Sequence, residues 1–147
     1  GTIGLMFSLY PCLPAEEVET IIKFTSTKID DIEPNKPYAG MYGAGMLNTG
    51  RAVKMVFDMF AEKEPVKIEN QRFSRWDFKL TSISEVMMQN QEFTENSTLN
   101  LTSKKRITIS KNTVLRPNAS GKIHLKIDTS LEKECNLQLR DPSILND

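Results

Sequence analysis

The chain has 147 residues, and its 19 basic and 19 acidic side chains give a formal net charge of zero. This length suits one domain of ordinary size or two small ones. The balanced charge argues against a dedicated nucleic-acid or membrane-surface protein, because such proteins usually carry a basic excess. No apolar stretch reaches the roughly 18 to 20 residues that cross a bilayer, so we expect no membrane span.

Three helices are expected in the first sixty residues. The first, over residues 2–10, stops at Pro11 and is apolar on nearly all sides, which is typical of a helix inside a larger structure. The second starts at Pro14, a residue that suits the first turn of a helix. After a loop over residues 27–45, the third begins near Asn48, whose side chain is a strong N-cap.

The second half of the chain alternates apolar and polar residues in short runs separated by turn signals. Short strands at such spacing predict a small antiparallel β sandwich or stacked hairpins. A charged stretch over residues 61–65 ends in a proline and is typical of a linker. The expected fold class is therefore α+β, with a helical unit over residues 1–60, a linker over 61–65 and an antiparallel β unit over 66–147.

Three segments of the first half occur in a recognisable order. They read Leu9-Tyr10-Pro11, then Pro14-Ala15-Glu16-Glu17-Val18, then Gly43-Ala44-Gly45-Met46-Leu47-Asn48 followed by Ala52-Val53. This order resembles the C-terminal end of a subtilisin-like serine peptidase domain, over about residues 1–58. Leu13 departs from the pattern, because the family usually has Ser or Thr there to cap the second helix.

The resemblance implies that the catalytic residues lie elsewhere. The family's serine belongs to a Gly-Thr-Ser-x-Ala-x-Pro motif that would lie upstream of Gly1, and its Asp, His and oxyanion-hole Asn would lie further upstream. We therefore expect no catalytic, cofactor-binding or metal-binding residue in this chain. It would be the C-terminal fragment of a secreted endopeptidase, inactive alone, with the upstream catalytic domain of the parent chain as its partner.

Residues 99–109 and 114–125 resemble the β modules appended to secreted peptidases and surface proteins of Bacteroidetes-type bacteria. This resemblance implies secretion or a cell-surface location. It also leaves open a second function, a non-enzymatic surface or adhesion module that binds a glycan or a protein.

The apolar side chains of the first helix need a cover if the catalytic body is missing. Leaving several of them in water would cost about 1.5 to 3 kcal/mol each. We expect them to pack against the β half or against a second copy of the chain, which would make a homo-oligomer. The residues concerned are Ile3, Leu5, Met6, Phe7 and Leu9.

Two groups of polar residues could form a functional site or could simply be exposed to solvent. His124 with Ser110 or Ser120 could be a hydrolytic pair, but a lone strand histidine facing solvent is the favoured interpretation. An acidic loop could bind calcium through oxygen ligands, but it lacks the EF-hand spacing and is interpreted as a solvated loop. Its residues are Asp30, Asp31, Glu33 and Asn35.

Three further sets also leave alternatives open. Lys104, Lys105 and Arg106 could bind phosphate or an acidic surface, or could form a solvated hairpin tip that resists edge pairing. Trp76, with Phe73, Phe78 and Phe93, could stack a sugar, although such aromatics are more often the core of a small β domain. Cys12 and Cys135 could pair if the protein is exported, or could be two buried free thiols.

Overall fold

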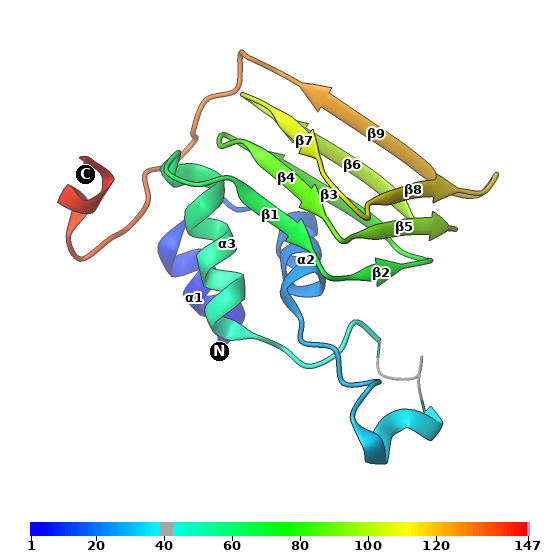
Figure 1. Cartoon of the computed structure of the whole chain (residues 1–147). Helices are drawn as coiled ribbons and strands as arrows, with labels where there is room; N and C mark the ends of the chain where they lie inside the picture. The colour runs from blue at the N-terminus through cyan, green and yellow to red at the C-terminus, as the bar shows by residue number, and fades with distance from the viewer. Residues whose placement is uncertain (39–42, 147) are drawn as a thin grey trace.

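The computed structural model describes residues 1–38 and 43–146 (Figure 1), so residues 39–42 of the loop between the second and third helices lie outside the described residues. The three expected helices are confirmed as α1 (Thr2–Leu9), α2 (Ala15–Thr25) and α3 (Thr49–Ala61), with short 3-10 helices at Glu33–Tyr38 and Pro142–Asn146. Asn48 caps α3 as expected, because its side chain accepts a hydrogen bond of 3.0 Å from the Arg51 N–H. No helix in the described ranges is long and apolar enough to cross a bilayer.

The second half forms short strands whose pairings are all parallel. The described strands are β1 (Val66–Glu69), β2 (Arg72–Phe73), β3 (Asp77–Ser82), β4 (Val86–Gln89), β5 (Glu92–Glu95), β6 (Thr98–Ser103), β7 (Ile107–Ile109), β8 (Val114–Pro117) and β9 (Lys122–Ile127). They make three sheets with the orders β1-β4-β7, β2-β5-β8 and β3-β6-β9. The predicted antiparallel sandwich or stack of hairpins is therefore wrong.

The physical reason is that the chain turns a corner after each strand instead of reversing. Val66 pairs with Val86, and Val86 pairs with Ile107, so each coil of about twenty residues lies on the previous one in register. The result is a parallel β-helix of three coils (Figure 1). Each sheet sends alternate side chains inward, and the apolar ones stack between the coils, as in Phe78–Leu99–Ile123 and Leu80–Leu101–Leu125.

Asparagines form one corner of the β-helix. Asn70, Asn90 and Asn112 each precede a strand of the β2-β5-β8 sheet, and their φ angles are 66°, 46° and 58°. Asn tolerates this left-handed conformation better than most residues with a side chain. The Asn90 side-chain amide also donates to the Asn70 side-chain oxygen at 2.9 Å. The same residue type therefore makes the same turn in each coil.

Helices α2 and α3 close the end of the β-helix at the first coil (Figure 1). The ring of Phe24 lies 5.1 Å from that of Phe78 in the core. Two side chains of helix α2 accept hydrogen bonds from the outer edge of β3. The Thr20 hydroxyl accepts one from the Lys79 N–H at 3.0 Å, and the Glu17 carboxylate accepts one from the Thr81 N–H. Side chains thus take the place of a neighbouring strand at this edge.

The first helix is only partly covered. Met6 is buried and α1 contacts α3, but Ile3 and Leu5 are 49% and 52% exposed. The β half therefore does not cover these two side chains. Coverage by a second copy of the chain stays a prediction.

A disulfide joins the helical half to the C-terminal tail. Cys12 and Cys135 are bonded, with 5.9 Å between their Cα atoms, so the interpretation of two free thiols is wrong for this structure. Two further contacts fasten the tail beside the bond. The Tyr10 hydroxyl accepts from the Glu134 N–H at 3.1 Å, and the Leu9 carbonyl accepts from the Gln138 N–H at 2.8 Å.

Candidate functional site

Among the described residues, His124 has neither of the two candidate serines as a hydrogen-bond partner. His124 is exposed on β9, where its neighbour in register is Asn100 of β6. Ser110 and Ser120 are exposed at corners of the third coil, and neither forms a hydrogen bond with His124. This arrangement holds no base beside a nucleophile.

The acidic loop is held by local contacts. Glu33 pairs with Lys36 at 2.7 Å, and the Asn35 amide donates to the Ile29 carbonyl at 3.0 Å. Within residues 1–38 and 43–146, no group of three or more His, Cys, Asp and Glu side chains is placed to hold a metal ion.

The basic triplet lies at a corner between the second and third coils, not at a hairpin tip. Lys105 pairs with Glu62 at 3.0 Å, while Lys104 and Arg106 form no ion pair within the part of the chain that the structure describes. The triplet therefore belongs to the β-helix itself, and its cations lie next to the third coil.

The aromatic residues divide into a core and one accessible ring. Phe73, Phe78 and Phe93 are buried around Phe24 and serve as core, although Phe73 also lines a cleft beside Trp76. Trp76 is only half-buried and lies at the rim of this cluster. A platform of four aromatics is therefore not available for a sugar.

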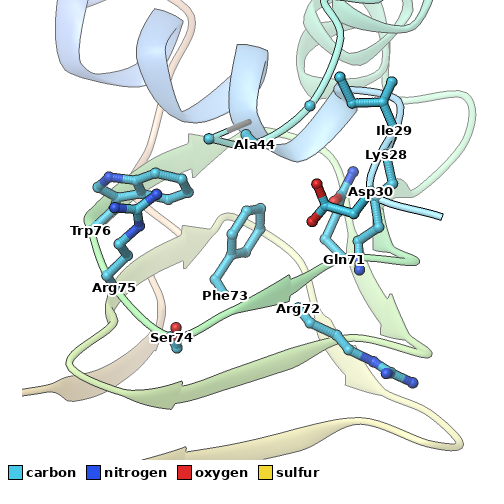
Figure 2. A pocket seen from close by; sticks show the side chains of 12 residues that line it. Lys28, Ile29, Asp30, Ala44, Gln71, Arg72, Phe73, Ser74, Arg75 and Trp76 are labelled. Carbon is cyan, nitrogen blue, oxygen red and sulfur yellow. The ribbon is translucent and has the colours of Figure 1, made fainter. Parts of the chain in front are cut away.

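A cleft of about 190 Å³ opens beside Trp76. Its walls are residues 28–30 and 43–45 of the loop and residues 71–76 of the first coil. Figure 2 shows Trp76 and Arg75 at one side of this cleft, Asp30 and Gln71 at the other, and Phe73 between them.

Glycine is required where the loop meets this cleft. Gly45 has a φ of 112°, and a Cβ there would lie 2.3 Å from the carbonyl oxygen of Thr27. The backbones of Thr27 and Met46 exchange hydrogen bonds of 2.8 and 2.7 Å directly beside it. The glycine therefore allows the close approach that forms this wall.

Cations already occupy part of the indole surface. The Arg75 guanidinium lies 4.3 Å from the Trp76 ring centroid, and the Lys23 ammonium lies 4.6 Å from it. On the opposite wall, the Gln71 amide donates to the Ser26 carbonyl at 2.6 Å. The described walls of the cleft thus present a cation and an aromatic ring to a small polar ligand, and they hold no nucleophile beside a base.

A buried carboxyl group was missed by the sequence analysis. Glu17 lies on α2 against β3, and burial raises its pKa from 4.5 to about 7, although the Thr81 N–H and the charge of Lys79 act in the opposite direction. Glu17, Thr20, Ile21 and Phe24 follow a helical i, i+3, i+4, i+7 pattern, and all four are buried. This spacing was the available signal that Glu17 faces the protein.

No family model matches the chain, and neither a curated protein nor a solved structure matches it.

Proposed function

We propose that this chain is the C-terminal, non-catalytic part of a secreted subtilisin-like serine endopeptidase, and that α1 packs against the catalytic body. The observation that carries the proposal is the exposure of two large apolar side chains of α1. Ile3 and Leu5 are about half exposed, and an apolar groove of about 270 Å³ lies beside Ile3 and Phe7, between α1 and α2. A helix that is apolar on nearly all sides is expected to be buried in its working state.

Local geometry at the subtilase-like segments supports the proposal. Asn48 caps α3, Gly45 takes a backbone conformation that few other residues adopt, and Ala52 is fully buried. These are the structural roles that the family pattern implies for the three positions. The cleavage chemistry, an acyl-enzyme formed on serine, would belong to the upstream domain.

The disulfide supports a secreted location. Disulfides persist in oxidising compartments and are rare in the reducing cytosol. The Cys12–Cys135 bond links the helical half to the end of the chain that follows the β-helix, so it suits a protein that must stay folded outside the cell.

Reading the gene upstream of Gly1 and assaying the isolated chain test this proposal. We expect an encoded Gly-Thr-Ser-x-Ala-x-Pro motif, and no hydrolysis of peptide substrates by the 147 residues alone. Absence of that motif, or turnover by the isolated chain that a serine-directed phosphonate blocks, would show that the proposal is wrong.

Variants of the longer protein test the role of α1. Leu5→Glu is expected to weaken peptidase activity and thermal stability by exposing a charge at the contact with the catalytic body. Leu47→Glu is the matched control, because Leu47 is similarly exposed but lies outside α1. Equal effects of the two substitutions would count against α1 as the contact.

The alternative is a non-enzymatic binding module, and the cleft beside Trp76 favours it. Trp76 is the only tryptophan of the chain, so its intrinsic fluorescence reports directly on this cleft. Titration with neutral and anionic oligosaccharides is the test. A saturable change that Arg75→Ala removes would support the alternative, and no change with any of them would count against it.

A further inference from the structure

The two ends of the β-helix differ in how they are covered. At the first coil, Glu17 and Thr20 of α2 accept hydrogen bonds from the edge of β3. At the third coil, β7, β8 and β9 are the last strands of their sheets, and no described strand pairs with their outer edges (Figure 1).

Backbone groups of the third coil face outward from this end. The N–H groups of Lys122 and Asp128 in and after β9 donate to the second coil, at 3.2 and 2.9 Å. In a parallel ladder, successive residues point alternately to the two neighbours. The backbone groups of Ile123, Leu125 and Ile127 therefore face away from the second coil and can pair with an added strand.

The side chains that point into the third coil are also left uncovered at this end of the β-helix. Ile68 and Met88 are fully buried, but Ile109, the next member of that stack, is 48% exposed. Likewise Ser82 and Ser103 are buried, whereas Ile127 is 46% exposed. The core of the β-helix thus reaches the surface at the third coil.

These side chains line an apolar groove of about 300 Å³ between β7 and β9. Its floor is aliphatic, and Lys105, Arg106 and Lys126 lie at its rim. The aliphatic residues are Ile107, Ile109, Leu125 and Ile127.

Charge decides what this groove can accept. Residues 104–127 hold seven Lys and Arg and no Asp or Glu, whereas residues 86–103 hold two Glu and no Lys or Arg. Of the seven cations only Lys105 has an ion pair among the described residues. Two third coils placed edge to edge would bring these like charges together, which opposes a dimer through this surface.

We propose that the open third coil binds an extended acidic segment of a partner protein, which adds as a strand beside β7 or β9. Main-chain hydrogen bonds would supply affinity, alternate aliphatic residues would fill the groove, and outward carboxylates would pair with Arg106, Lys122 and Lys126. This inference does not depend on the proposed peptidase origin of the chain.

Fluorescence anisotropy with a labelled peptide tests the proposal. The probe is the heptapeptide Glu-Val-Glu-Ile-Glu-Val-Glu, and the control is Lys-Val-Lys-Ile-Lys-Val-Lys, which has the same apolar residues. We expect saturable binding of the acidic peptide only. Binding should weaken as added salt shortens the Debye length from about 10 Å to about 3 Å.

Three variants locate the site. Ile109→Asp should remove detectable binding, and Lys126→Glu should weaken it several-fold. Ile32→Asp should leave it unchanged, since Ile32 is 51% exposed and lies in the loop after α2. Circular dichroism checks that each variant folds, and if Ile109→Asp does not fold, the exposed Lys126→Glu decides the test.

Three results would overturn the proposal. They are equal binding of the basic peptide, binding that neither Ile109→Asp nor Lys126→Glu reduces, and absence of binding by the unaltered chain. Light scattering adds a fourth. A dimer that Lys126→Glu alters and Ile109→Asp dissociates would make a second copy the occupant of the groove.

Discussion

Replacing Glu17 by glutamine should make the stability of the protein less dependent on pH. The folded state raises the pKa of this carboxyl group from 4.5 to about 7, because burial disfavours its charged form. The folded protein therefore binds the proton more tightly than the unfolded chain does. The tighter binding of this proton adds to the free energy of unfolding. The added stability is fully present below pH 4.5 and is lost as the pH rises to about 7.

The size of the change in unfolding free energy follows from the rise in the pKa of Glu17. A rise of the pKa from 4.5 to about 7 corresponds to about 3 kcal/mol of unfolding free energy. Above pH 7 the charged Glu17 is destabilising by up to this amount. In Glu17→Gln the side-chain oxygen can still accept from the Thr81 N–H, but no charge is buried. We therefore expect Glu17→Gln to be more stable than the unaltered chain at high pH and similar to it at low pH.

Urea unfolding followed by circular dichroism, at several values from about pH 4 to about pH 8, measures the difference. The comparison between the two proteins cancels the titration of all other groups to first order. Glu19→Gln is the matched control, because Glu19 is an exposed residue of α2 whose charge does not contribute to the raised pKa of Glu17. A difference between Glu17→Gln and the unaltered chain that stays constant with pH would refute the reasoning, as would a lower stability of Glu17→Gln at high pH only.

Three further substitutions test the fold. Cys135→Ser should lower the free energy of unfolding by about 5 kcal/mol on the chain-entropy model, since the bond spans 123 residues, and urea unfolding of the unaltered chain with and without reductant checks this. Phe24→Ala should cost about 3 to 5 kcal/mol by opening a cavity between α2 and the first coil, measured by the same unfolding curves. Asn48→Ala should cost about 1 kcal/mol through loss of the α3 cap, while Asn48→Asp should retain most of the stability in a thermal melt.

The helices could be predicted from the sequence because their signals are local. Pro11 and Pro14 bound α1 and α2, and Asn48 marks the start of α3. The direction of the strands was not predictable from alternation, since a coil of a β-helix and a hairpin both need short alternating runs with turns between them. The two folds differ in which strand each strand pairs with. In the β-helix the paired strand lies about twenty residues away in the sequence.

A repeat in the sequence carries the missing information. Asn70-Gln71-Arg72-Phe73 recurs as Asn90-Gln91-Glu92-Phe93, and Leu80-Thr81-Ser82 recurs as Leu101-Thr102-Ser103. Each repeated pair lies in register in the structure. A fixed period near twenty residues is typical of solenoids, so a search for internal repeats would have favoured the observed fold.

The cleft beside Trp76 could be predicted only in part. The sequence singled out Trp76 and its aromatic neighbours, but the choice between core and exposed ring depends on side-chain direction at a corner where Trp76 has a φ of 75°. The loop residues that form the opposite wall are more than thirty positions away in the chain. Their approach depends on tertiary contacts, which no local pattern reports.

The Cys12–Cys135 bond determines how the protein responds to mechanical force. A pull applied between the two ends of the chain would pass through the first dozen residues, the sulfur atoms and the final dozen, because the covalent bridge is the shortest path. All three coils lie within the enclosed loop and would bear no tension until the bridge is reduced. In single-molecule stretching, the β-helix should therefore extend only in the presence of a reductant.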